Sequence, residues 1–183
     1  MFPSSTHSST LGRWPLLGHL GWLRGALGAL LGIGGAAATG WLVLGSEAAG
    51  ALPWLVAPIG ASAVLVFAVP ASPLAQPWPV AGGNILSGTI GFLIAATLGP
   101  GPLACAVSVC LAIAAMSLAR CLHPPGGACA LLGPLGAGAT LALPGGFLLT
   151  LALNVALLVF IGWAYNSLTG HPWPHRPAPV VVP

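Results

Sequence analysis

The sequence predicts an all-α, polytopic membrane helix bundle built from two inverted three-segment repeats, each with a proline-broken second segment. The first observation is the composition: 57% of the 183 residues are hydrophobic and 3% are charged, whereas about 25% of the residues of a soluble domain are charged. The second is the mean hydropathy of +1.00. The third is an internal similarity between the two halves of the chain. A water-soluble enzyme is excluded, because so few charged residues could not cover its surface.

The ionisable residues and cysteines limit the partners and cofactors. The chain has four arginines, no lysine and one acidic residue, Glu47. The arginines are scattered and form no basic run that could follow a phosphate backbone, so we expect no nucleic acid partner. The cysteines show no C-x-x-C spacing, and we interpret them as packing residues without a metal or cofactor. They are Cys105, Cys110, Cys121 and Cys129.

We expect no enzymatic activity. The nearest approach to a catalytic pair would be the thiol of Cys121 or Cys129 beside His123. No acidic residue lies nearby in the sequence to orient the histidine, and such an orienting group is part of a thiol–imidazole catalytic arrangement.

Six hydrophobic segments follow one another along the chain, separated by turn residues. We place them at about 25–45, 51–69, 82–98, 103–122, 126–142 and 146–165. The first has 21 residues, enough to cross a hydrocarbon core of roughly 30 Å and too many for a usual signal sequence. The breaks contain Ser46-Glu47, the stretch from Pro70 to Pro79, Pro100-Gly101-Pro102, His123-Pro124-Pro125 and Pro144-Gly145-Gly146.

These segments form one predicted transmembrane domain, at residues 21–170. Residues 1–20, rich in Ser, Thr and Gly, are predicted to be a flexible tail, and residues 171–183 a proline-rich tail.

The arginines predict the orientation in the membrane, because basic residues in short loops stay on the cytoplasmic side. Six crossings place all four arginines on one side and Glu47 on the other, with both termini cytoplasmic. An alternative with four crossings, in which segments 51–69 and 126–142 are re-entrant, puts Arg120 on the far side. We favour six crossings and expect a bacterial inner membrane.

The two halves of the chain resemble each other. Pro58-Ile-Gly-Ala-Ser-Ala-Val-Leu65 aligns with Pro125-Gly-Gly-Ala-Cys-Ala-Leu-Leu132, and Gly82-Gly-Asn-Ile-Leu-Ser87 aligns with Gly145-Gly-Phe-Leu-Leu-Thr150. We therefore predict two repeats, at about 25–98 and 103–167. Because each repeat holds three segments, the two would have opposite orientations in the membrane, which is a common architecture among transporters.

The repeated motif predicts a binding site for a small anion. If Pro58 and Pro125 each lie in the first turn of a helix, the following backbone N–H groups are free to bind, and two positive helix ends would face each other near the midplane. The ionisable side chains of Arg120 and His123 have the same positive sign as these helix ends. The two residues share a helix face if the fourth helix extends that far. The predicted binding residues are Gly60, Ala61, Ser62, Arg120, His123, Gly126, Gly127 and Ala128.

Other roles are open for several polar residues. Arg120 can also extend to lipid headgroups, and His123 can bond a loop carbonyl. Helix–helix hydrogen bonds are the expected role of Asn84 and Asn154, although both could line a pathway. Pathway lining is also predicted for Ser72 and Gln76, in the proline-rich link.

Two motifs resemble the HPP family of integral membrane proteins. His123-Pro124-Pro125-Gly126-Gly127-Ala128 is similar to its name-giving motif, and Ala57–Leu65 followed by Pro70–Pro77 is similar to its other recurrent signature. With Gly82-Gly83-Asn84, the resemblance covers roughly residues 25–167. It implies four transmembrane helices, against the six predicted above. Because some members are associated with nitrite transport, it also implies nitrite as the first candidate substrate.

We predict a permease or channel for a small monovalent anion in the lipid bilayer. The alternative is a structural or assembly subunit of a membrane complex, because three small-residue spacings could serve oligomer contacts as well as internal packing. A homo-oligomer is compatible with either function. The spacings are Gly21-x-x-x-Gly25, Gly28-x-x-x-Gly32 and Ser87-x-x-x-Gly91.

Overall fold

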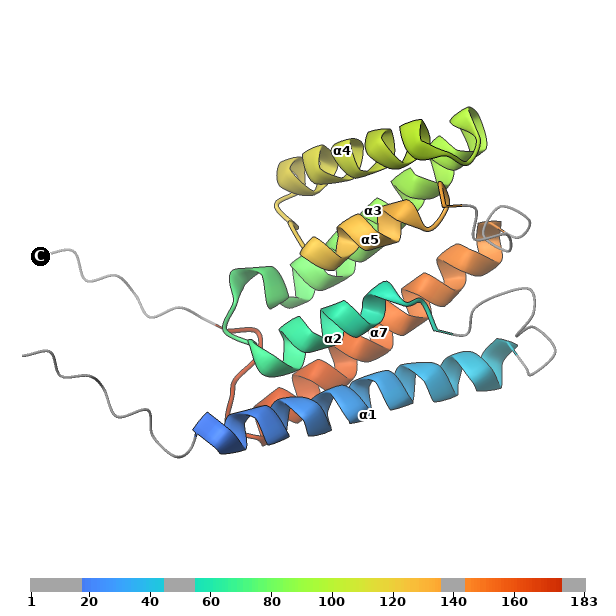
Figure 1. Cartoon of the computed structure of the whole chain (residues 1–183). Coiled ribbons are helices and arrows are strands. Elements are labelled where there is room, and N and C mark those ends of the chain that lie inside the picture. Colours follow the sequence, from blue (N-terminus) through green and yellow to red (C-terminus); the bar gives the residue numbers. More distant parts are fainter. Residues whose placement is uncertain (1–17, 45–54, 136–143, 176–183) are drawn as a thin grey trace, which may run out of the picture.

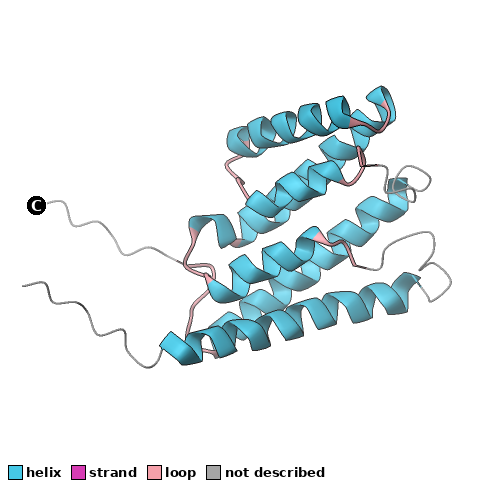
Figure 2. Ribbon diagram, in the orientation of Figure 1, coloured by secondary structure: helices cyan, strands magenta, loops and turns pink. Residues whose placement is uncertain are grey.

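The computed structural model describes residues 18–44, 55–135 and 144–175. In these residues every regular element is a helix, so the all-α prediction is confirmed (Figure 2). Glu47, both ends of the chain and parts of the second and fifth segments lie outside the described residues. The elements are α1 (Gly18–Leu44), α2 (Pro58–Ala68), the short 3₁₀ helix η2 (Pro73–Ala75), α3 (Pro77–Leu98), α4 (Pro102–Leu118), α5 (Pro124–Leu131) and α7 (Pro144–Leu168).

Proline starts each of the described α-helices after the first. A proline in the first turn loses no hydrogen bond, because the N–H groups there have no partner within the helix. The expected positions of Pro58 and Pro125 in a first turn are therefore confirmed. The prediction that Pro77 and Pro79 lie in a break between segments is wrong. Both prolines belong to the first turn of α3, where their missing N–H groups cost no hydrogen bond.

Within the part of the chain that the structure describes, three helices are long and apolar enough to cross a membrane: α1, α3 and α7. At a rise of about 1.5 Å per residue, the 17 residues of α4 measure about 25 Å, whereas α2 and α5 measure only about 16 and 12 Å. The chain nevertheless alternates in direction. Figure 1 shows α1, α3 and α5 running one way, and α2, α4 and α7 running the other.

The helices pack in two groups around α3 and α7, which contact each other. α3 also packs against α4 and α5, and α7 packs against α1 and α2. Within the groups, α1 contacts α2 and α4 contacts α5; the two short helices, α2 and α5, contact each other across the groups (Figure 1).

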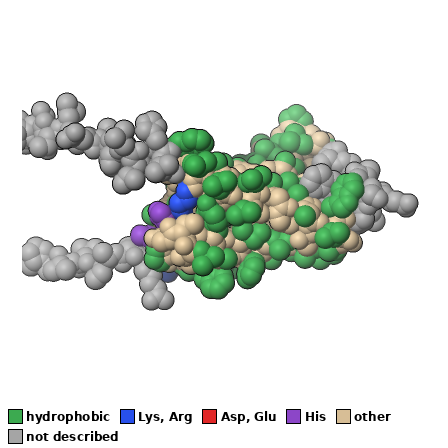
Figure 3. Space-filling view, turned by 90° about the horizontal axis from the view of Figure 1, so that it is seen from below, with side chains coloured by type: hydrophobic (Ala, Val, Ile, Leu, Met, Phe, Trp, Pro, Cys, Tyr) green, Lys and Arg blue, Asp and Glu red, His purple; other side chains and the backbone are tan. Residues whose placement is uncertain are grey.

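Two of the small-residue spacings serve internal packing. Phe67 of α2 lies against Gly28 and Gly32 of α1, where a Cβ atom would come within 2.5 Å of its ring. Ser87 and Gly91 are buried on α3, with Gly91 against the backbone of α5. The exposed surface is largely apolar, and Figure 3 shows hydrophobic side chains along the bundle with Arg and His side chains at one end.

The chain stays packed beyond the predicted start of the proline-rich tail at residue 171. Trp173 is 2% exposed, and its indole N–H donates to Ala75 O at 3.1 Å. At the other end, α1 already begins at Gly18, inside the predicted flexible tail.

The helix α4 ends at Leu118, four residues before the predicted end of its segment. Arg120 has a φ of +53°, and the N–H of Cys121 returns to Met116 O at 2.9 Å. A left-handed residue with this returning bond ends a helix. Arg120 and His123 therefore share no helix face: the arginine is exposed and the histidine is buried.

We expect Arg120→Gly to raise the free energy of unfolding by about 1 kcal/mol, because glycine adopts a positive φ without the steric cost of a Cβ atom. Thermal unfolding in detergent measures the effect. Arg120→Ala is the control, since it removes the same charge and keeps the Cβ atom. Equal stability of the two variants would contradict the backbone explanation.

Candidate functional site

His123 is the centre of a polar cluster inside the bundle. It is the residue before the first turn of α5, with extended backbone, and its side chain is 0% exposed. Its Nδ1 lies 2.8 Å from Leu74 O in η2. Because a carbonyl oxygen only accepts, Nδ1 carries the hydrogen. In the neutral ring Nε2 is then an acceptor, and it lies 2.8 Å from Ser62 Oγ of α2.

The amide of Asn84 continues the cluster on α3. Its Nδ2 donates to Ser62 Oγ at 3.0 Å and to Val80 O at 2.9 Å. Its Oδ1 accepts from the thiol of Cys129 on α5, with 3.2 Å between sulfur and oxygen. Asn84, Ser62 and Cys129 are all 0% exposed, so α2, α3 and α5 are joined by polar contacts in the interior.

The hydrogen bonds that join these side chains to one another form a series in which each group donates to the next. The donors follow in the order Cys129, Asn84, Ser62 and His123, and the last bond ends on Leu74 O. A buried polar group is stable only when its hydrogen bonds are made, and here each side chain has a partner. We call these four side chains the imidazole cluster.

The repeated motif places its residues in matching surroundings. Ile59 and Gly126 are both buried, as are Ser62 and Cys129, whereas Ala61 and Ala128 are exposed. Ser62 and Cys129 also both bond Asn84. Gly60 and Gly127 are less buried, with nothing within 4 Å of an added Cβ.

The sequence suggested that the starts of the two short helices face each other near the midplane. In the structure the two helix starts do not meet end to end. The residue before α5, His123, contacts Ser62, the fifth residue of α2, because the two short helices lie side by side. Two of the predicted backbone donors also have local partners: Gly60 N bonds Ala57 O at 3.0 Å, and Gly126 N bonds His123 O at 2.9 Å. The side chains of the imidazole cluster, rather than these amides, bring the two helices together.

Arg120 lies outside the imidazole cluster but beside it. It lines an open hollow of about 390 Å³ together with Leu74, Met116 and Leu122. Leu74 is the residue whose carbonyl holds the His123 ring, and Leu122 directly precedes the histidine. The hollow therefore lies between the arginine and two residues next to His123, although the buried ring itself does not line it.

The other predicted pathway residues hold turns and helix ends. Ser72 Oγ accepts from Leu74 N at the start of η2, and Gln76 Nε2 donates to Pro70 O and Ser72 O. Asn154 Oδ1 accepts from Val56 N just before α2, at 2.9 Å. Asn84 is the one of the four that joins the imidazole cluster.

Sequence reasoning missed the structural role of Arg24. Its guanidinium donates to Phe67 O at the end of α2, at 3.0 Å, to Asn166 of α7, and to Thr169 directly after that helix. The Tyr165 hydroxyl donates to Arg24 O at 2.8 Å. The arginine ties α1, α2 and α7 together, and the sequence carried no signal for this beyond its charge.

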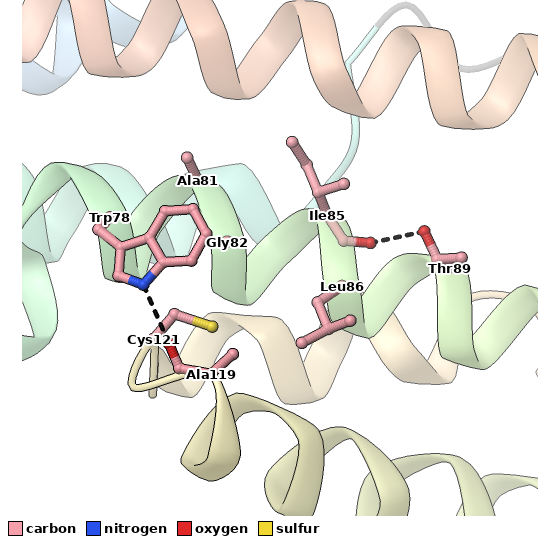
Figure 4. Close-up of a pocket in the computed structure, with 8 residues that line it drawn as sticks. All are labelled: Trp78, Ala81, Gly82, Ile85, Leu86, Thr89, Ala119 and Cys121. Atoms are coloured by element: carbon pink, nitrogen blue, oxygen red, sulfur yellow. Dashed lines mark hydrogen bonds between the residues drawn. The ribbon is translucent and has the colours of Figure 1, made fainter.

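A second hollow, of about 410 Å³, is a poor site for an anion. It lies between α3 and the residues after α4, and its lining is mostly apolar (Figure 4). The Trp78 indole N–H already donates to Ala119 O, and the Thr89 hydroxyl to Ile85 O. An anion there would find no unused donor on either side chain.

Comparison with known proteins gives a family match over most of the chain. Residues 16–174 match the family model described as the HPP transmembrane region. Two transmembrane proteins of Dictyostelium discoideum are similar, one 45% identical over 83 residues and the other 43% identical over 86 residues. These matches cover 43% and 45% of this chain, and 27% and 30% of those proteins. No solved structure matches.

Proposed function

This chain belongs to the HPP family of integral membrane proteins, and from this premise we propose that it is a permease or channel for a small monovalent anion. Nitrite is the first candidate substrate, because the motif resemblance implies it. The observation that carries the proposal is the imidazole cluster, where hydroxyl, amide and imidazole groups of three helices meet in an apolar bundle. Polar groups inside a membrane protein are costly and usually serve a pathway.

The charges favour an anion over a cation. The chain has four arginines and one acidic residue. Arg120 lines the hollow that also contacts Leu74 and Leu122, the neighbours of His123, and its charge would raise the local concentration of anions there. The described residues around this hollow include no carboxylate that would attract a cation.

The packing supports two inverted repeats, with α1, α2 and α3 in one and α4, α5 and α7 in the other. If each helix is replaced by its equivalent in the other repeat, every contact between these α-helices, within and between the repeats, corresponds to a contact that is also present. The contact of α1 with α2 corresponds to that of α4 with α5, α1 with α7 to α4 with α3, and α2 with α7 to α5 with α3. Equivalent helices also run in opposite directions (Figure 1). Such a pair of repeats is suited to alternating access around a shared centre.

We also propose that the end of the bundle carrying the start of α1 is cytoplasmic. Figure 1 shows that α1 starts and α4 ends at this same end of the bundle. Arg24 lies near the start of α1 and Arg120 lies just after α4, and basic residues prefer the cytoplasmic side. Six crossings of the membrane would place both arginines on the cytoplasmic side, although α2 and α5 are short. The bacterial inner membrane remains part of this proposal.

The test is anion flux into proteoliposomes that contain the purified protein, comparing nitrite with nitrate, chloride and formate. We expect selective nitrite flux and a decrease of about tenfold in Arg120→Gly, because this variant removes the attracting charge and not the fold. Gly34→Ala is the matched control, at an exposed α1 position where a Cβ meets nothing within 4 Å. Absence of flux for all four anions would contradict the proposal and favour a structural or assembly subunit.

A further inference from the structure

We propose that His123 and Ser62 form a buried proton-binding site, and that each anion crosses together with one proton, so that transport is electroneutral. This inference rests on the proposed function, and it adds the co-transported ion and the residues that carry it. Three observations support it: the alternative partners of the Ser62 hydroxyl, the absence of a nearby carboxylate in the described residues, and the hollow lined by Arg120 and by Leu74, whose carbonyl bonds the ring.

The geometry accommodates His123 both neutral and protonated. In the neutral ring, Nε2 accepts the Ser62 hydroxyl hydrogen at 2.8 Å. In the protonated ring, Nε2–H donates to Ser62 Oγ, and the hydroxyl turns to Pro58 O, 3.4 Å away. Asn84 donates to Ser62 Oγ in both states. The extra proton therefore needs only the rotation of one hydroxyl hydrogen, and no buried polar group loses its partner.

Among the described residues, a proton on His123 would have no counter-ion. On the elements around the ring, or directly before them, the titratable or charged groups are Cys129 on α5, Cys121 before it, and Arg120, which is exposed. Beyond these, Arg24 bonds the C-terminal end of α2 at Phe67 O, and the backbone of His175 bonds Gln76 after η2. The elements α2, η2 and the adjoining part of α3 contribute none, and Glu47 is the one acidic residue of the whole sequence. A buried unpaired cation is strongly unfavourable.

An incoming anion supplies the missing charge. A monovalent anion beside protonated His123 gives a neutral pair, so anion binding favours protonation, and protonation favours anion binding by the same factor. The proton binds Nε2 when the anion arrives and leaves it when the anion leaves, with no covalent step. One negative and one positive charge cross together, and the net charge moved is zero.

The experiment uses proteoliposomes with nitrite as the probe and imposes a pH gradient and a membrane potential separately. We expect an alkaline interior to drive nitrite uptake, with one proton taken up per anion, and we expect the potential to have no effect. Vesicles without protein give the background permeation of nitrous acid, which is subtracted. Nitrite-dependent current through the protein would overturn the inference while leaving the proposed function intact.

Variants assign the coupling to the two residues. In His123→Gln we expect the remaining nitrite flux to become insensitive to the pH gradient and sensitive to the potential. Ser62→Ala, which removes the partner of Nε2, is expected to lose most of the coupling and tests the site even if the histidine variant does not fold. Ser108→Ala is the control, because Ser108 is buried outside the imidazole cluster. Unchanged coupling in Ser62→Ala would refute the assignment, and absence of flux in the unmodified protein would refute the proposed function as well.

Discussion

Replacing Gly91 by alanine is expected to destabilise the bundle by about 3 kcal/mol or more, a large effect for a single added methyl group. The added Cβ would lie 2.2 Å from the carbonyl oxygen of Ala130 and 2.7 Å from its carbon. Both atoms belong to the backbone of α5, so no side-chain rotation relieves the collision. α3 and α5 would have to separate, and the measurement is the midpoint of thermal unfolding in detergent.

Gly34→Ala is the matched control for this prediction. It adds the same methyl group to α1, where nothing lies within 4 Å, and alanine has a helix propensity about 1 kcal/mol better than glycine. We expect the control to unfold at the same temperature as the unmodified protein or higher. If Gly91→Ala did the same, the close contact between α3 and α5 would be wrong.

The local structure could be predicted well where a residue type has one dominant physical effect. Proline in the repeated motif predicted the starts of α2 and α5, because a missing N–H is harmless in a first turn and costly later. The same physical effect places Pro77 at the start of α3. Its neighbour Pro79 made the stretch resemble a break, although both prolines fit within one first turn.

The candidate site was predicted only in part, because its contacts join distant residues. Ser62, Asn84 and His123 were each selected from the sequence, but nothing there showed that they bond one another. Cys129 was interpreted as a packing residue, yet its thiol donates to Asn84. The expected pairing of Arg120 with His123 assumed a longer α4, and the positive φ of Arg120 ends that helix first.

Arg24 illustrates a further limit of the sequence. Its position in the sequence indicates only the orientation of the chain in the membrane, since an arginine near the end of a hydrophobic segment usually extends to the headgroups. In the structure its guanidinium lies at the C-terminal end of α2, which carries a partial negative charge, and donates to Phe67 O. Asn166 joins the same group by accepting from Arg24 and donating to Val66 O.

Arg24→Met is therefore expected to lower the free energy of unfolding by about 3 kcal/mol, because it leaves the acceptors at the end of α2 and on Asn166 without their charged donor. Unfolding midpoints in detergent measure the loss. Arg24→Lys keeps the charge but cannot hold α2 and α7 at once, so we expect an intermediate value. Tyr165→Phe removes only the bond to Arg24 O and should cost about 1 kcal/mol. If both Arg24→Met and Arg24→Lys were as stable as the unmodified protein, the arginine would not act as the link between α1, α2 and α7.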